Sequence, residues 1–430
     1  MRNMTEKAWY PWLLVILFSL MGLSFPAAVT QFSMVAAELA EVMAVPKQTV
    51  LLADTMRAIC LVIGMFASDF IYRSLGLRKT ICLGVFFQVA SQFLVPLTVS
   101  AGNLPLFFVF KAMQGLNAVA FPLYLAAITQ WIDSRSAGLA TAVFNGSFTA
   151  GAGVGAFVVG RIVPAFGWKA SFFLVGTICL IFAAPVLLIV RENPAFTAAR
   201  LEAKDTRRNA RKASSGYGRV LAQLITWMLV ITLVANTWVT QAVTVDLSVY
   251  AEELGYSYGQ TGSLMLCISI ITVISSILGG AVSDFFAARS ENRVRSRALV
   301  LMLGYVLSAV TAAVLPGVAG RSIGLLSVIA CAMMFGASWS AGVFWALPAE
   351  IYPSRELVSA TAFCSGASNI PNPIAPAVVG VLLGTRGYWG AGWMTCCAVS
   401  ILSVLAALYI AFRRPRAGEN YSRTDITSVI

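Results

Sequence analysis

Long apolar runs separated by short polar segments make up most of this 430-residue chain. Residues 8–37, for example, contain no charged side chain. About 20 helical residues cross a bilayer core, so this stretch predicts a membrane-spanning helix. It is too long for the core of a signal peptide, and no small-residue cleavage site closes an earlier apolar core. We therefore expect an uncleaved first helix with Trp9, Tyr10 and Trp12 at the membrane interface.

The same rule, with turn residues and charge clusters as breaks, predicts an all-α membrane protein with twelve transmembrane helices. Their expected limits are 9–35, 48–70, 80–99, 104–131, 138–163, 169–190, 220–248, 259–284, 298–318, 321–347, 358–383 and 390–412.

Composition changes the picture by excluding whole classes of protein. Hydrophobic residues make up 59% of the chain and charged residues 11%, whereas about 25% of a soluble globular protein is charged. Histidine is absent, which removes the usual general base and the commonest metal ligand. The eight cysteines lie in apolar stretches without a CxxC pair. We therefore expect neither an enzyme nor a disulfide framework, and no metal or other cofactor.

The basic residues sort by side of the membrane. With the N-terminus inside, 23 of the 30 Lys and Arg residues fall in cytoplasmic segments, five in outer loops and two within spans. The positive-inside rule then predicts a multi-pass protein of the cytoplasmic (inner) membrane with both termini in the cytoplasm. The longest basic run, 191–219, nearly lacks stacking aromatics, so we interpret it as a solvated linker facing the lipid surface and expect no nucleic-acid partner.

An internal repeat divides the chain. Residues 134–168 can be laid without gaps on 354–388, which aligns Ser134-Arg135 with Ser354-Arg355. The repeat predicts two pseudo-symmetric six-helix bundles with a binding site between them near the mid-plane of the membrane. The predicted divisions are an N-terminal bundle, a basic cytoplasmic linker, a C-terminal bundle and a cytoplasmic tail, at 1–190, 191–219, 220–412 and 413–430.

Loop motifs at equivalent places in the two halves give the chain a family resemblance. After span two stands GMFASDFIYRSLGLRK, and after span eight stands GGAVSDFFAARSENRVRSR. With these motifs the chain resembles the major facilitator superfamily over nearly its whole length. The resemblance implies the major facilitator fold and a secondary transporter. It also implies that Asp69 with Arg73, and Asp284 with Arg289, form ion pairs that gate the cytoplasmic side.

Span four narrows the resemblance to the anion:cation symporter family of organic-anion carriers. Its sequence KAMQGLNAVAFP keeps a cation, a glycine and a proline in the family's register, at Lys111, Gly115 and Pro122. Ala118 stands where the family has an acidic residue. The resemblance implies transport of a small carboxylate-type anion by alternating access. The missing acid leaves proton symport, anion exchange and uniport open.

Charged residues inside spans are the first candidates for a binding site, because a charge in the bilayer core is costly. Lys111 is the candidate for pairing with an anionic substrate, and its alternative is an interfacial lysine whose stem reaches outward. Asp54 and Arg57 are three residues apart, so they can pair on one helix face. Their pair is either structural or couples protons to transport, through protonation of Asp54 and release of Arg57 to the anion.

Polar side chains in spans expected to line the cavity complete the set of substrate-binding candidates. For each of them, hydrogen bonding between helices is the alternative. They are Gln31, Asn145, Trp238, Gln241 and Asn369. Three prolines in NIPNPIAP, residues 369–376, predict a kinked eleventh helix.

The partners expected are a small anionic molecule, protons or a counter-anion, and the lipid bilayer, and we expect a monomer. Two other functions remain open at this point. A drug or metabolite exporter of the same superfamily would differ in the direction of transport. A receptor or sensor would bind its ligand without flux.

Overall fold

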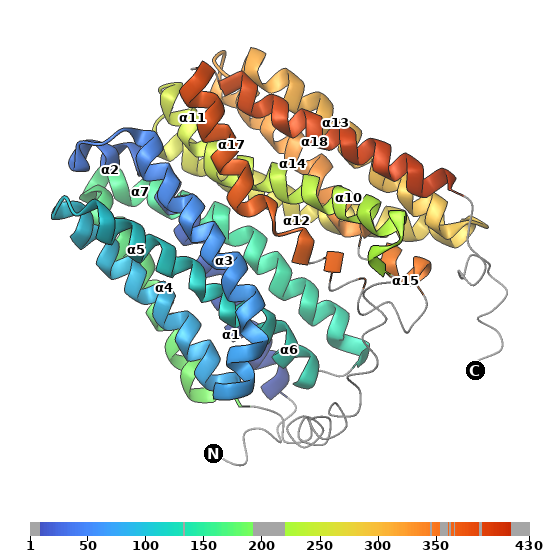
Figure 1. The fold of residues 1–430 in the computed structure, drawn as a ribbon, viewed down its shortest axis with the longest axis horizontal. Helices are drawn as coiled ribbons and strands as arrows, with labels where there is room; N and C mark the ends of the chain where they lie inside the picture. Colours follow the sequence, from blue (N-terminus) through green and yellow to red (C-terminus); the bar gives the residue numbers. More distant parts are fainter. Residues whose placement is uncertain are drawn as a thin grey trace. The chain divides into compact units, whose positions relative to one another are not determined.

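The secondary structure of the computed structural model is helical in the residues that it describes, namely 9–131, 134–191, 220–344, 346–352, 360, 363–364, 366–386 and 389–413 (Figure 1). Within these ranges, ten helical stretches are long and apolar enough to cross a membrane. The all-α membrane fold is thereby confirmed. The predicted linker 191–219 and tail 413–430 lie outside the described ranges except for their first residues.

The helices of the first half follow the predicted spans, with a short extra helix after the first. They are α1 (Tyr10–Met34), α2 (Ala36–Met43), α3 (Lys47–Leu75), α4 (Leu77–Ser100), α5 (Leu104–Gly115), η2 (Leu116–Ala120), α6 (Phe121–Trp131) and α7 (Ser134–Ile189). Two predicted spans, 138–163 and 169–190, are the two arms of α7, because Gly167 leaves the helical conformation with a φ of 77°. That positive φ suits a glycine.

The second half begins at α10. Its helices are α10 (Leu224–Gln241), η3 (Ala242–Asp246), α11 (Leu247–Glu253), α12 (Tyr258–Arg289), α13 (Arg293–Val318), α14 (Ile323–Phe344), α15 (Leu347–Ile351), α17 (Pro371–Arg386) and α18 (Trp389–Phe412). The helical segment formed by α10, η3 and α11 continues to Glu253, beyond the end of the predicted span 220–248. In the predicted span 358–383, turns at 368–370 precede a helix that starts at Pro371. Proline suits a helix start, where its missing N–H costs no hydrogen bond.

The chain forms two compact units, and their limits cut across the second half. Unit 1 comprises Met1–Arg208 and Thr244–Ser269, and unit 2 comprises Asn209–Val243 and Ile270–Ile430. Residues 244–269, from η3 through the first part of α12, therefore pack with the N-terminal helices. Within unit 1, the Tyr258 hydroxyl donates to Glu38 Oε1 at 2.7 Å, and Lys47 Nζ lies 3.0 Å from Glu252 Oε2.

Small residues let the helices approach closely. A Cβ on Gly115 of α5 would overlap the backbone of Arg57 in α3, and one on Gly336 of α14 would overlap the carbonyl oxygen of Gly304 in α13. Such contacts are typical of membrane helices, where close van der Waals packing replaces the hydrophobic effect as the main attraction. Large apolar side chains are in turn exposed on the outside, among them Phe66, Phe166 and Leu188. This surface suits lipid and not water.

Candidate functional site

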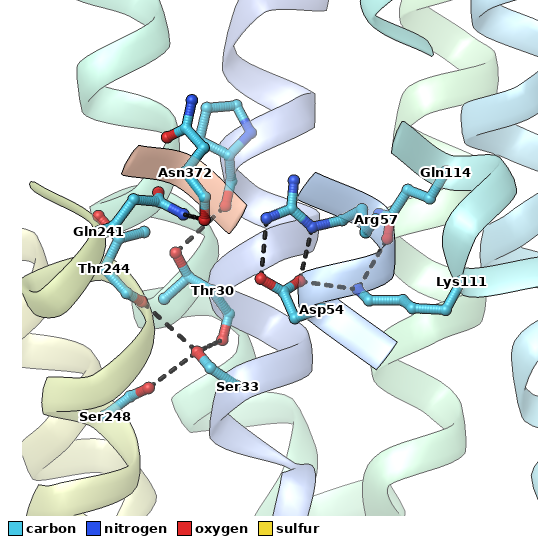
Figure 2. Close-up of polar contacts among 11 residues, drawn as sticks. Thr30, Ser33, Asp54, Arg57, Lys111, Gln114, Gln241, Thr244, Ser248 and Asn372 are labelled. Carbon is cyan, nitrogen blue, oxygen red and sulfur yellow. Dashed lines mark hydrogen bonds and ion pairs between the residues drawn. The ribbon is translucent and has the colours of Figure 1, made fainter. Parts of the chain in front are cut away.

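The clearest candidate site is a buried cluster of three charged side chains in unit 1. Arg57 and Asp54 form a two-pronged ion pair on α3, with Nε 2.5 Å from Oδ1 and Nη2 2.8 Å from Oδ2. Lys111 of α5 approaches the same carboxylate, and its Nζ lies 3.7 Å from Oδ1 (Figure 2). Each of the three side chains is at most 2% exposed. The pairing of Asp54 and Arg57 agrees with their three-residue spacing, whereas the approach of Lys111 joins two helices.

Local structure positions Lys111. The side chain of Asn103 caps the start of α5 by accepting a hydrogen bond from the backbone N–H of Leu106 at 3.1 Å. Lys111 follows two turns later and donates from Nζ to Gln114 Oε1 at 2.7 Å. One residue after that, Gly115 lets the α5 backbone lie against that of Arg57. The cap, the lysine and the glycine thus bring the ammonium of Lys111 beside Asp54.

Aromatic rings of α1 form another wall of the cluster. The Lys111 Nζ lies 3.7 Å from the centre of the Phe32 ring, and the Arg57 guanidinium carbon lies 5.9 Å from the centre of the Phe25 ring. The face of an aromatic ring attracts a cation, and most strongly where water is excluded. These contacts stabilise positive charge without neutralising it.

The cluster therefore holds two cations against one anion. Asp54 has both oxygens engaged, and the remaining terminal nitrogen of Arg57 donates to none of the described residues (Figure 2). A net positive charge in a bilayer is costly unless it is compensated. A carboxylate or sulfonate on a small molecule would supply the missing negative charge, together with acceptors for the guanidinium and the ammonium.

A second polar group lies where α1 meets the segment from η3 to α11. Ser248 Oγ donates to Ser33 Oγ at 2.8 Å, and Ser33 Oγ contacts the carbonyl oxygen of Thr244 at 3.5 Å (Figure 2). Asp246 lies between Thr244 and Ser248 in the sequence. It is 6% exposed, and its Oδ2 has no hydrogen-bond partner among the described residues. Sequence reasoning missed Asp246, although it lies inside the predicted span 220–248, two residues from its end. Because α11 continues to Glu253, seven residues after Asp246, the rule for charges inside spans applies to it.

Of the polar candidates, several make contacts between helices. In unit 1, Gln31 Nε2 donates to Ser171 Oγ at 3.1 Å. In unit 2, Trp238 Nε1 donates to Thr395 Oγ1 at 3.0 Å, and Gln241 Nε2 donates to the carbonyl oxygen of Asn372 at 3.3 Å. Asn369 Oδ1 accepts from Asn372 Nδ2 at 3.1 Å. The bonds of Gln31, Trp238 and Gln241 join two helices, as in the alternative stated for them, whereas the bond of Asn369 is local. Substrate contact by any of the four stays a prediction.

The gating candidates are described in part. Asp284 Oδ1 accepts from Arg297 Nη1 at 2.7 Å, and Arg297 Nε donates to Glu350 Oε1 at 2.9 Å. Arg289 instead donates to the carbonyl oxygen of Phe285 and stacks on that ring. The partner of Asp284 is thus Arg297 of α13 and not the expected Arg289. The side chains of Asp69, Arg73 and Asn145 lie outside the part of the chain that the structure describes.

Comparison with known proteins decides the family. The model of the Major Facilitator Superfamily matches residues 12–295, more than half of the chain. The chain belongs to this superfamily. It is therefore a multi-pass membrane transporter and not an enzyme, and the resemblance found in its loop motifs is confirmed.

Curated relatives within the superfamily are distant and agree in the chemistry of their substrates. The probable sulfoacetate transporter SauU of Cupriavidus necator is 24% identical over 73% of this chain and 74% of its own length. The hexuronate transporter of Bacillus subtilis is 25% identical over 68% of this chain and 69% of its own. The probable galactarate/D-glucarate transporter GudP of the same organism is 22% identical over 81% and 80%. All of these named substrates are organic anions, as the resemblance to the anion:cation symporters implies.

Solved structures share the fold. The crystal structure of a D-xylose-proton symporter superposes with a TM-score of 0.71 over 94% of this chain and 98% of its own, at 17% identity. The inward-open xylose transporter XylE of E. coli gives a TM-score of 0.68 over 96% and 98%, at 16% identity. At this identity the likeness establishes the fold alone, the major facilitator fold.

Proposed function

We propose that this transporter carries a small organic anion with a carboxylate or sulfonate group across the cytoplasmic membrane. The observation that carries the proposal is the buried cluster of Asp54, Arg57 and Lys111, in which two cations share one carboxylate, so that the cluster keeps a net positive charge. The anion binds to the ammonium of Lys111 and the open side of the Arg57 guanidinium. The relatives named for sulfoacetate, hexuronate and glucarate support this class of substrate.

Asp54 holds the two cations together in this proposal. Its oxygens are 2.5 and 2.8 Å from the guanidinium, which favours a structural ion pair over the alternative in which Asp54 carries the coupled proton. Without Asp54, like charges would repel across the site and the protein would bear two uncompensated cations in the membrane. The carboxylate thus keeps both cations in place for a ligand that neutralises the remaining charge.

Transport proceeds by alternating access, in which the site opens to one side of the membrane and then to the other. Both termini are in the cytoplasm in this proposal, because the basic segments then lie on the cytoplasmic side. The chain acts as a monomer, and the anion moves with protons or in exchange for a counter-anion.

The test is a ligand screen followed by flux. Purified protein is heated with sulfoacetate, D-glucuronate, D-glucarate, inorganic sulfate or D-xylose, and the ligands that raise the melting temperature are tested for uptake in proteoliposomes. We expect stabilisation by one or more organic anions and saturable uptake of the same compounds. Stabilisation by the neutral sugar alone would overturn the proposal. Binding without uptake would favour a receptor.

A matched pair of lysine variants locates the site. Lys111→Met removes the buried cation, and Lys169→Met removes an exposed one. Truncating one partner of a buried charge pair costs about 2–5 kcal/mol, so we expect kcat/KM for the anion to fall at least about 30-fold in Lys111→Met. Lys169→Met keeps the wild-type value. Equal kinetics in the two variants would place the substrate elsewhere.

A further inference from the structure

Asp246 occupies an unusual place in its helix. It is the last residue of η3, a five-residue π-helical segment between α10 and α11. π-helical segments are rare, and they frequently mark functional sites because they turn side chains away from the regular helical pattern. Although Asp246 stands at the start of α11, its side chain does not cap that helix.

The carboxyl group of Asp246 is buried without an ion-pair partner among the described residues. The residue is 6% exposed, Oδ2 has no hydrogen-bond partner, and no Lys or Arg lies within ion-pair distance among the described residues. An isolated carboxylate in a membrane interior is very costly, and the usual resolution is that the group takes up a proton. The other buried acid described in unit 1, Asp54, is paired with the cations Arg57 and Lys111.

The neighbourhood of Asp246 connects it to the cation cluster. Val245, the preceding residue, packs in one apolar cluster with Phe25, Val29 and Leu61. Phe25 is the ring that faces Arg57. The segment is held against α1 by the contacts of Ser33 with Thr244 and Ser248 (Figure 2).

Few charged groups share the buried interior with Asp246 among the described residues of unit 1. Helix α1 contains no charged side chain, and the buried charged groups described in unit 1 besides Asp246 are Asp54, Arg57 and Lys111. Among the described residues, Asp54 is the charged group that interacts electrostatically with Asp246, and the interaction is repulsive. Glu252 and Glu253 of the same segment are turned to Lys47.

We propose that Asp246 carries the proton that is co-transported with the anion. When Asp246 is ionised, the two buried acids Asp54 and Asp246 equal the two buried cations Arg57 and Lys111 in number, so these charges sum to zero and a second anion near Asp246 is repelled. When a proton from water forms an O–H bond with the carboxylate, the four groups carry one positive charge and the anion restores neutrality. Proton and anion therefore each raise the affinity for the other, and this reciprocity is what symport requires.

This inference rests on the proposed function, and it adds the coupling ion and its site. It predicts one proton for each monoanion, so the transported complex is neutral. A pH difference of one unit then sustains about a tenfold accumulation of the anion, since one proton supplies about 1.4 kcal/mol across it. Membrane potential adds nothing for a monoanion.

The first test needs no substrate. Infrared difference spectra of the purified protein in acidic and alkaline buffer are expected to show the carbonyl stretch of a buried carboxylic acid, which is lost in Asp246→Asn. The control is Glu291→Gln, which changes an exposed acid and keeps the band. A band that persists in Asp246→Asn overturns the assignment.

The second test separates coupling from transport. In proteoliposomes, Asp246→Asn is expected to exchange labelled for unlabelled D-glucuronate, a monoanion, at a rate within about twofold of wild type, because the neutral amide mimics the protonated acid. Its accumulation ratio under a pH gradient falls from about tenfold to about one. Asp246→Glu keeps a titratable group and retains part of the accumulation, which also shows that the position tolerates substitution.

The outcomes distinguish the two proposals. Accumulation by Asp246→Asn at the wild-type ratio overturns the role of Asp246 and leaves the anion site standing. Absence of anion uptake by the wild-type protein, with the infrared band of Asp246 present, overturns the proposed function and leaves the protonated acid standing.

Discussion

Gly115 of α5 lies against the carbonyl group of Arg57 in α3 so closely that a Cβ atom would overlap it. The contact joins the helix that carries Lys111 to the helix that carries Asp54. Gly115→Ala must push the two helices apart, which we expect to cost about 1–3 kcal/mol of stability and to separate Lys111 from Asp54. The melting temperature and anion uptake of the purified variant both fall.

The control for this variant is Gly317→Ala, because a Cβ at Gly317 meets nothing within 4 Å. It keeps or slightly raises the melting temperature, since alanine favours a helix over glycine. Equal melting temperatures and uptake for the two variants would show that the close approach at Gly115 has no energetic role.

Asp54→Asn leaves Arg57 and Lys111 without their shared carboxylate. Removing one partner of a buried ion pair costs about 3–5 kcal/mol, so the melting temperature of the ligand-free protein falls. The double variant Asp54→Asn/Arg57→Gln regains part of the loss, because one unpaired cation is removed with the acid. If the single variant is as stable as wild type, Asp54 does not hold the cluster together. Loss of pH-driven accumulation with unchanged stability would return the coupled proton to Asp54.

Variants of Arg297 and Arg289 test which of the two arginines pairs with Asp284 near the end of α12. Arg297 bonds to Ser283, Asp284 and Glu350, whereas Arg289 bonds to a backbone carbonyl and an aromatic ring. Arg297→Gln is expected to lower the free energy of unfolding by about 1–2 kcal/mol and Arg289→Gln by less than about 1 kcal/mol. Thermal unfolding of the two variants in the same detergent measures the difference. The reverse order would support the pairing expected from the sequence.

Tyr258 ties the start of α12 to α2 through Glu38. Tyr258→Phe removes one hydrogen bond to a charged group, and we expect it to cost about 1.5–3 kcal/mol at most. Tyr409→Phe, at a more exposed position of α18, serves as the control and changes the melting temperature little. A double-variant cycle of Tyr258→Phe with Glu38→Gln checks the contact, because the second substitution has little further effect once the first is made.

Much of the fold could be predicted because the thickness of the bilayer sets the length of each span, and apolar runs of that length can be read from the sequence. The need for about 20 apolar residues places each span, so the limits of α1, α4 and α13 fall within a few residues of those expected. The breaks at Gly167 and Pro371 follow from local backbone preferences. The predicted span 220–248 already covers α10 and η3, but the π-helical form of η3 could not be foreseen, since it leaves no pattern in the apolar residues, and neither could the continuation of α11 to Glu253.

The candidate site could be predicted residue by residue and not as a cluster. The cost of a charge in the membrane marks Asp54, Arg57 and Lys111 individually, and spacing pairs the first two. The meeting of Lys111 with Asp54 depends on the approach of two helices at Gly115, which no spacing encodes. For the same reason Asp284 was assigned the nearest arginine in the sequence, while its partner in space is Arg297 on the next helix.

The charge balance between Asp246 and the cluster of Asp54, Arg57 and Lys111 limits the leakage of protons through the carrier. The empty carrier with Asp246 ionised and the fully loaded carrier are both neutral, so both can change conformation in the bilayer at little electrostatic cost. A carrier that holds the proton without the anion bears an uncompensated charge, which costs about 2.5–3.5 kcal/mol in the membrane core. That form is about a hundredfold rarer than the neutral ones. The surplus cation that attracts the substrate thus also prevents protons from slipping through the membrane alone.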